Sequence, residues 1–335
     1  MSARAWTCRT GLAALWLLAL LVARPVLAAD QPTVAPAAKP YAKADGLSGS
    51  LTIVGSDTLN NLMTLWAESF RKLYPAVAIR LEAKKTGAVP PALADGTAHL
   101  VHLSRLMDDG EVAKFQAKHG YRPTPYAVAV DALVVYVHKD NQLEGLTLDQ
   151  VRAVFSKSPA SSYDRVASWG QLSVGGEWEN APLRLYGRDA ASGTTEFFKE
   201  HALARNELRD DVRLFTESAA LVKALGEDRF GIGYSGLAAV SPDVRPVPLA
   251  ADEFSPYVEP TFDNVKNRRY PLRRYLYVYV DQEPRKILRG KKPLPPVVRE
   301  FLRYVYSQDG QAFVTKDGYF PVEDWIVERA QKTIK

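Results

Sequence analysis

Residues 50–81 read SLTIVGSDTLNNLMTLWAESFRKLYPAVAIRL, and this stretch decides the fold class. A short β-like run at its start ends at Gly55. Apolar residues then recur at steps of three and four over residues 59–73, which is the pattern of an amphipathic helix. A proline ends that helix, and apolar residues alternate over residues 77–81 as they do in a strand. The order strand, glycine turn, helix, strand predicts a βαβ unit.

The same alternation of strand and helix patterns continues along the chain. We expect further strands at residues 100–103, 127–137, 183–186, 231–234 and 274–280. We expect further helices at residues 90–96, 108–119, 146–155, 195–203, 218–225 and 296–307. Alternating elements of this kind predict an α/β protein with layered sheets and helices. The length of 335 residues allows two lobes of about 130 residues each.

Composition and charge exclude several classes of protein. Hydrophobic residues make up 47% of the chain and charged residues 24%, so the bulk of the chain is neither disordered nor a coiled coil. The formal charge is +5, but three arginines lie in the first 28 residues. Without them the chain has 40 basic and 38 acidic residues. Such a balance argues against a nucleic-acid-binding protein, which carries a basic stripe.

The N-terminus has the pattern of a secretory signal peptide. An apolar run at residues 11–23 follows two arginines and is shorter than the ~20 residues of a spanning helix. Small residues allow cleavage after Ala28, so we assign residues 1–28 to the signal peptide and expect a periplasmic or secreted protein. The alternative is an uncleaved anchor. The single cysteine, Cys8, lies inside this segment, which excludes disulfides from the mature protein. Residues 29–49 are rich in Pro, Ala and Gly, and we interpret them as a flexible leader.

Two places combine a strand end, small hydroxyl residues and a helix start. They are residues 55–58 and residues 188–194. The free N–H groups and partial positive charge of a helix N-terminus bind anions, and nearby hydroxyls add donors. Arg188 can grip two oxygens of an oxyanion with its planar fork, and Gly193 lets the backbone approach closely. Taken singly, each feature is also explained by a helix cap or a surface ion pair.

Six segments in order resemble one protein family. They are SLTIVGSDTL, DALVVYVHKDNQLEGLTLDQVRAVFS, GRDAASGTTEFF, FGIGYSGL, YPLRRYLYVYV and VREFLRYVYSQDGQAFVTKDGYFPV, which together span residues 50–322. This region resembles the phosphate-binding proteins of bacterial ABC importers, which have the type II periplasmic binding-protein fold. The resemblance implies two lobes, each a mixed sheet flanked by helices, with the ligand cleft between them. Residues 50–131 and 274–335 would form lobe one, and residues 132–273 lobe two.

The resemblance also implies the ligand residues and the partners. Lobe one would contribute Ser56, Asp57, Thr58, Thr86, Gly87, Ser104 and Arg105, and lobe two Arg188, Ser192, Gly193 and Thr194. The ligand would be inorganic phosphate, delivered to the membrane subunits of an ABC importer. Such a protein is a monomer that closes around the anion, catalyses no reaction, and needs no cofactor, metal or nucleic acid.

The chain departs from the family pattern in two loops. The second loop reads KKTGAVPPA where many members are rich in Gly and Ser. The third reads LVHLSRLM and lacks the aspartate that accepts the proton of hydrogen phosphate in some members. Asp57 stands in the first loop, where a neutral hydroxyl is common. Asp57 is therefore either the replacement acceptor or a helix cap, and the sequence leaves both interpretations open.

Other functions stay open on the sequence alone. The ligand could be another tetrahedral oxyanion such as sulfate, molybdate or tungstate. A secreted phosphoester hydrolase is a rival, although Ser192 lies in AASGT and no G-x-S-x-G motif occurs. A surface adhesion or sensory protein that has lost transport is another. His99 and His102 form an H-x-x-H pattern, but on a strand they point to opposite faces, which argues against a shared metal.

Overall fold

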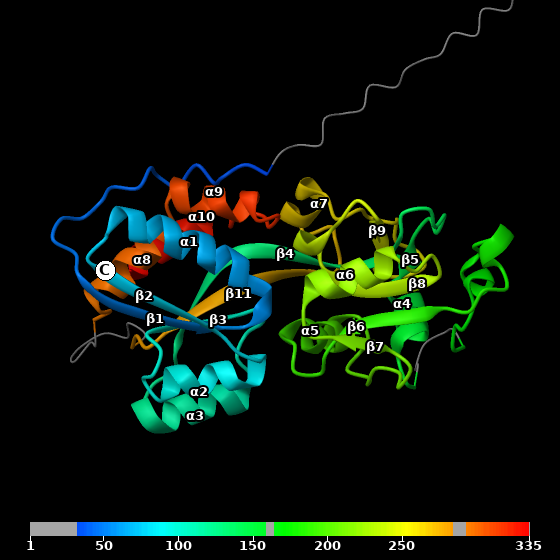
Figure 1. Cartoon of the computed structure of the whole chain (residues 1–335), viewed down its shortest axis with the longest axis horizontal. Coiled ribbons are helices and arrows are strands. Elements are labelled where there is room, and N and C mark those ends of the chain that lie inside the picture. The colour runs from blue at the N-terminus through cyan, green and yellow to red at the C-terminus, as the bar shows by residue number, and fades with distance from the viewer. Residues whose placement is uncertain (1–31, 159–163, 284–292, 335) are drawn as a thin grey trace, which may run out of the picture. The chain divides into compact units, whose positions relative to one another are not determined.

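The computed structural model describes residues 32–158, 164–283 and 293–334 (Figure 1). The predicted signal peptide, residues 1–28, lies outside the described residues. The described residues, from 32 onward, belong to one compact unit. Among the described helices, none is both long enough and apolar enough to cross a membrane.

The structure alternates strands and helices, as the sequence predicts. The strands are β1 (Gly49–Gly55), β2 (Val77–Ala83), β3 (Leu100–Leu103), β4 (Thr124–His138), β5 (Leu146–Thr147), β6 (Arg184–Arg188), β7 (Arg213–Phe215), β8 (Gly231–Gly236), β9 (Val244–Val247), β10 (Leu249–Ala250) and β11 (Arg273–Val280). The helices are α1 (Asn60–Leu73), α2 (Val89–Ala94), α3 (Asp109–His119), α4 (Leu148–Phe155), α5 (Gly193–His201), α6 (Ser218–Gly226), α7 (Phe262–Lys266), α8 (Pro296–Val305), α9 (Gln308–Lys316) and α10 (Asp324–Thr333).

Strand β4 connects two groups of strands. The main sheet has the order β2-β1-β3-β11-β4-β8-β6-β7, and β9 also pairs with β4. Strand β4 pairs with β11 as far as Ala132, and from Leu133 onward it pairs with β8. Figure 1 shows β4 and β11 running between the β1–β3 group and the β6–β8 group. The two long strands therefore form the connection between both groups.

Helices cover both faces of the β1–β3 group because its strands alternate. Leu51 and Ile53 of β1 pack in the cluster that contains Phe70 of α1. Val54 points the other way and packs with Leu93 of α2 in a second cluster. Successive side chains of a strand point to opposite faces, so each face of β1 receives its own helices. The mixed α/β architecture predicted from the sequence is confirmed.

The segment 32–48 differs from the predicted flexible leader. It has no helix or strand, as its composition indicates, but specific contacts hold it against the C-terminal helices. The backbone N–H of Ala37 donates to Asp324 Oδ1 at 2.7 Å, and the Tyr41 hydroxyl donates to Glu300 Oε1 at 2.5 Å. These partners lie more than 250 positions away in the sequence, so composition alone gave no sign of them.

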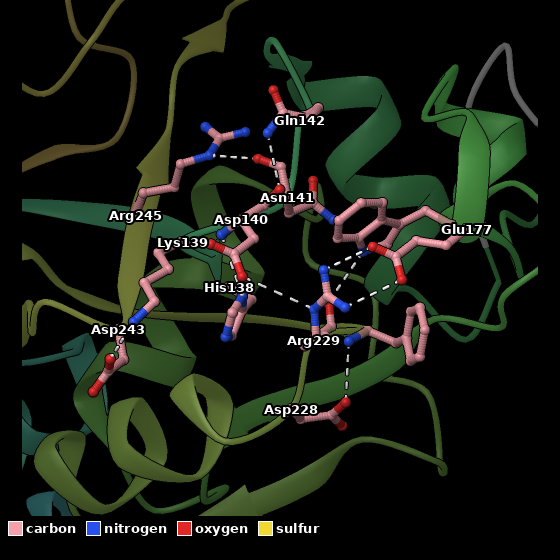
Figure 2. Close-up of polar contacts among 12 residues, drawn as sticks. His138, Lys139, Asp140, Asn141, Gln142, Glu177, Asp228, Arg229, Asp243 and Arg245 are labelled. Carbon is pink, nitrogen blue, oxygen red and sulfur yellow. Dashed lines mark hydrogen bonds and ion pairs between the residues drawn. The ribbon is translucent and has the colours of Figure 1, made fainter.

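A polar network fixes the turn that follows β4 (Figure 2). Arg229 lies 2.7 Å from Glu177 and 4.0 Å from Asp140. Arg245 of β9 donates from Nε to the carbonyl oxygen of Asn141 at 2.8 Å. The charged groups at this end of β4 are thus paired with one another, and their role is to hold the turn against β8 and β9.

Candidate functional site

A cavity of about 280 Å³ lies where four strands end, and we call it the site cavity. Its lining comes from residues 56–58 and 60 after β1, 83–86 at the end of β2, 188, 189, 191 and 192 at the end of β6, and 216–217 after β7. Because β1 runs parallel to β2 and β6 runs parallel to β7, the carboxyl ends of each pair meet at one edge. Ligands of α/β proteins bind at such edges. A larger cavity of about 480 Å³ elsewhere is lined mainly by aromatic and apolar groups.

The first loop requires a glycine at its start. Strand β1 ends at Gly55, and a Cβ there would lie 2.0 Å from Nε2 of His102. Burial lowers the pKa of His102 to about 3, so the ring is neutral where it packs. The chain then turns through a short 3₁₀ helix, Asp57–Leu59, into α1. This close packing of glycine on histidine sets the position of residues 56–58.

The second loop ends in a capped helix N-terminus. Strand β6 ends at Arg188, and Ser192 caps α5 by accepting a hydrogen bond from the backbone N–H of Thr194 at 3.2 Å. Helix α5 has nine residues, and its first turn is buried. The free N–H groups of such a turn attract an anion.

Arg188 is the buried cation of the site. Only 2% of its side chain is exposed, and its donors reach the carbonyl oxygens of Phe215 and Thr216 and the hydroxyl of Ser218. Its Nη2 also lies 2.9 Å from Asp57 Oδ2. A guanidinium held on several sides keeps its fork in one orientation, which favours recognition of an oxyanion by geometry.

Asp57 faces Arg188 across the site cavity. The carboxylate of Asp57 forms an ion pair with that arginine. Ser56 precedes the 3₁₀ helix Asp57–Leu59, but its side chain makes no capping hydrogen bond. Burial raises the pKa of Asp57, and the nearby charge of Arg188 only partly opposes this effect. Glu217, which also lines the cavity, raises the pKa of Asp57 further. An aspartate of this kind can exchange a proton with a ligand.

The structure brings most of the predicted ligand residues together. The site cavity is lined by Ser56, Asp57, Thr58, Thr86, Arg188 and Ser192. The next three predicted residues pack directly behind this lining. The N–H of Gly193 donates to Thr86 Oγ1 at 2.9 Å, and the hydroxyls of Thr58 and Thr194 lie 3.3 Å apart. A Cβ at Gly193 would lie 2.5 Å from Ser104 Oγ.

Two buried hydroxyls of this group have no protein partner. Among the described residues, Ser56 Oγ and Ser104 Oγ are fully buried and make no hydrogen bond. A buried hydroxyl without a partner costs free energy, so such groups need a reason to be present. Donation to a ligand oxygen is a reason consistent with their position beside the site cavity.

The other two predicted ligand residues lie neither in the cavity lining nor among the residues packed behind it. Gly87 belongs to the turn before α2, and a Cβ added there would meet nothing within 4 Å. Arg105 pairs with Glu111 at 2.7 Å and also with Glu196 of α5. Its guanidinium therefore joins the loop after β3 to the helix that begins at the site.

Sequence reasoning missed the residues that follow β7. Thr216 and Glu217 line the site cavity, but β7 has only three residues, two of them exposed. Such a strand has no detectable alternation, so nothing marked the residues after it as a loop of the site. Asp189 also lines the cavity; it lies in the predicted loop of residues 188–194 but was not among the predicted ligand residues.

The two histidines of the H-x-x-H pattern do not share a ligand. His99 accepts a hydrogen bond from the N–H of Thr52 at 3.0 Å, while His102 packs on Gly55. Within the described part of the chain, no three His, Cys, Asp or Glu side chains are grouped as a metal site would need.

Comparison with known proteins agrees with this geometry. The model of the PBP superfamily domain matches residues 34–309. The phosphate-binding protein PstS of Pseudomonas aeruginosa is 45% identical over 300 residues, which cover 89% of this chain and 91% of that protein. The phosphate-binding protein PstS of Bacillus subtilis is 26% identical over 284 residues and 84% of both chains.

Solved structures share the fold. A putative phosphate ABC transporter substrate-binding protein from Clostridium perfringens, with bound phosphate, superposes with a TM-score of 0.66 at 22% identity, covering 82% of this chain and all of that chain. A possible phosphate-binding protein from Planctomyces limnophilus gives a TM-score of 0.62 at 24% identity, covering 86% and 98%. The type II periplasmic binding-protein fold that the resemblance implied is therefore confirmed. The chain belongs to the PBP superfamily and, within it, to the family of the PstS phosphate-binding proteins.

Proposed function

We infer that this protein captures inorganic phosphate in the periplasm and delivers it to an ABC importer. The observation that carries this proposal is the pairing of a buried guanidinium with a carboxylate of raised pKa in one hydroxyl-lined cavity. Arg188 supplies the positive charge, and Asp57 supplies an acceptor. Two relatives of this chain, from Pseudomonas aeruginosa and Bacillus subtilis, are phosphate-binding proteins PstS.

Binding would use donors that the fold already holds in place. Arg188 would give charge-assisted hydrogen bonds to the phosphate, with the anion taking over the N–H that now pairs with Asp57. Ser56, Thr58, Ser104 and Ser192, together with the N–H groups at the start of α5, would donate to the rest. No bond is made or broken, so affinity depends on how well these donors match the acceptors of the ligand.

Selectivity would depend on Asp57. Phosphate carries a proton at neutral pH and can donate a hydrogen bond to a carboxylate, whereas sulfate has no proton and is repelled by it. An acceptor in the first loop would replace the aspartate that the third loop lacks. The alternative from the sequence is a helix cap; the ion pair of Asp57 with Arg188 supports the acceptor role instead.

Closure would bring the two sides of the cavity together. We propose that residues 50–131 with 274–335 form one lobe and residues 132–273 the other, with β4 and β11 as the connection. Thr58 and Thr194, and likewise Arg105 and Glu196, would then be contacts between lobes in the closed state. Gly87 and Arg105 stay proposed as ligand residues only through family resemblance.

The direct test is calorimetric titration of residues 29–335, freed of bound anion, with phosphate and then with sulfate. We expect phosphate to bind with a Kd of about 1 μM or less, and sulfate to give no heat. Sulfate binding would keep the fold and change the substrate. No heat with either anion would contradict the proposed function.

Variants of Arg188 locate the site. Arg188→Ala removes charge-assisted hydrogen bonds worth ~1.5–3 kcal/mol each, so affinity should fall by at least ~10-fold. Arg188→Lys keeps the positive charge but lacks the planar guanidinium that can donate two parallel hydrogen bonds, so it should also weaken phosphate binding. Arg184→Ala is the control, because Arg184 lies on the same strand but pairs with Asp228 at the surface. Equal affinity of all variants would show that the anion binds elsewhere.

A further inference from the structure

A buried ion pair lies next to the site at the point where β4 changes partner. Asp131 of β4 and Arg274 of β11 stand directly opposite each other in the sheet. Arg274 Nε donates to Asp131 Oδ2 at 2.9 Å, and Arg274 Nη2 lies 2.8 Å from the same oxygen. Their side chains are 2% and 1% exposed. Two residues further along, at Leu133, β4 pairs with β8.

Arg274 also contacts the helix that begins at the site. Its Nη2 donates to Thr194 Oγ1 at 3.1 Å, and its guanidinium lies 5.4 Å from the ring centre of Phe197. Thr194 and Phe197 are three positions apart on α5 and therefore share one face of the helix. The arginine thus holds the first turn of α5 at two points.

The direction of the hydrogen bond to Thr194 is fixed by chemistry. A guanidinium has only donors, so the hydroxyl oxygen of Thr194 must be the acceptor. The single hydrogen of that hydroxyl is then left for another acceptor. Within the described part of the chain, the other side-chain contact of this hydroxyl is Thr58 Oγ1 at 3.3 Å, and Thr58 lies on the cavity lining.

We propose that Arg274, held by Asp131, is a positioning residue that makes the Thr194 hydroxyl an obligatory donor to the bound anion. This inference rests on the proposed function, because it concerns the same cavity. The arginine does not touch the anion. It selects against ligands that present a donor at this position, and it ties the site to the two connecting strands.

A merely structural role would give a different result. Buried ion pairs between two strands often serve only to fix a sheet, and breaking one lowers stability. In that case, changes at Arg274 would shift the melting temperature and leave anion affinity unchanged. Affinity, and its coupling to Thr194, is therefore the readout that separates the two roles.

The test is a double-mutant cycle measured by calorimetry with inorganic phosphate. Thr194→Val removes the hydroxyl and should lower affinity at least tenfold, whereas Thr194→Ser should keep it close to wild type. Asp131→Asn combined with Arg274→Gln removes both charges together, and should lower affinity about as much as Thr194→Val. The variant with all three substitutions should bind phosphate no more weakly than the weaker binder among Thr194→Val and the doubly neutralised protein. The reason is that both sets of changes remove the same hydrogen-bond donor.

Controls keep the test decisive. Arg273→Gln removes the neighbouring arginine, which pairs with Glu323 instead of the site, and should leave affinity unchanged. If the doubly neutralised protein does not fold, Arg274→Lys decides, since a lysine keeps the charge but cannot hold Asp131 and Thr194 together. Wild-type affinity in these folded variants, or losses that add to that of Thr194→Val, would overturn the proposal. Absence of phosphate binding by the wild-type protein would instead overturn the proposed function.

Discussion

Asp57 and Arg188 form an ion pair across the site cavity, with Asp57 Oδ2 2.9 Å from Arg188 Nη2. The arginine is almost fully buried, whereas the aspartate side chain is 38% exposed. An incoming anion meets both the attraction of the guanidinium and the repulsion of the carboxylate. The pair therefore favours an anion that can give a proton to Asp57 while it accepts hydrogen bonds from Arg188.

Asp57→Asn should remove the discrimination between phosphate and sulfate. An amide cannot repel sulfate, and it replaces a charge-assisted hydrogen bond to phosphate that is worth ~1.5–3 kcal/mol. We expect phosphate affinity to fall roughly 10- to 150-fold and sulfate binding to become measurable by calorimetry. Asp95→Asn, at the surface beside Lys118, is the control and should change neither affinity. Unchanged selectivity would rule out the acceptor role.

The pH dependence of stability should also depend on Asp57. Because burial raises its pKa in the folded protein, the unfolded state loses this proton first as the pH rises. The stabilising effect of the protonated group is present below the ordinary pKa and is lost as pH rises through the folded pKa. In anion-free buffer, the melting temperature of Asp57→Asn minus that of wild type should therefore increase from pH 4 to pH 7. If this difference in melting temperature decreases from pH 4 to pH 7, the pKa of Asp57 is not raised in the folded protein.

Gly193→Ala should weaken phosphate binding while Gly87→Ala should not. A methyl group at residue 193 would lie 2.5 Å from Ser104 Oγ, and moving these groups apart costs ~1–3 kcal/mol. We expect affinity to fall roughly 5- to 150-fold in calorimetry. The same methyl group at residue 87 meets nothing within 4 Å. Equal affinity of the two variants would show that the approach of α5 to Ser104 is not needed for binding.

Glu196→Gln should reduce affinity slightly, since its ion pair with Arg105 joins α5 to the loop after β3. Partly exposed pairs are worth ~0.2–1 kcal/mol, which predicts a roughly 1.4- to 5-fold loss. Glu200→Gln, on the same helix but paired with Arg205, is the control. Arg105→Gln serves as the second measurement. A loss of more than about 10-fold there, with little effect of Glu196→Gln, would make Arg105 a direct ligand of the anion.

His102→Leu should make the fold less sensitive to acid. Burial lowers the pKa of His102 from its ordinary value near 6.5 to about 3. Between these two pH values, the imidazole takes up a proton only in the unfolded state. The stability of wild type should therefore fall, relative to the variant, by up to ~1.4 kcal/mol per pH unit in this window. Urea unfolding at pH 7, 5 and 4 measures the difference. A constant difference between the two proteins would show that the buried ring does not control acid stability.

Strong periodicity made most of the fold predictable. The amphipathic pattern of α1 and the long apolar run of β4 gave their elements within a few residues. Thr147 caps α4 as predicted, although residues 146–147 form the short strand β5 instead of helix. Strands β7, β9 and β10 were not predicted, because two to four residues carry too little pattern. Helices α7, α9 and α10 were also missed, although the apolar spacing of α10 was visible in the sequence.

The candidate site was predictable only in part. Strand ends followed by hydroxyls and a helix marked Ser56 and Ser192 correctly as lining residues. The pairing of Asp57 with Arg188 was not predictable, because it depends on how two distant loops face each other. The same holds for Arg274, for which the sequence predicted only a place in a strand. Its role becomes visible once its opposite partner and the start of α5 are placed around it.

The strand order has a consequence for how the chain is made. Strand β3 is flanked on one side by β1 and on the other by β11, which ends at Val280 of 335 residues. During synthesis, one edge of β3 stays unpaired until β11 has been made. More than half of the polypeptide is synthesised between these two strands. An unpaired strand edge is a template for wrong pairing. The nascent chain therefore needs protection from aggregation until its last quarter is available.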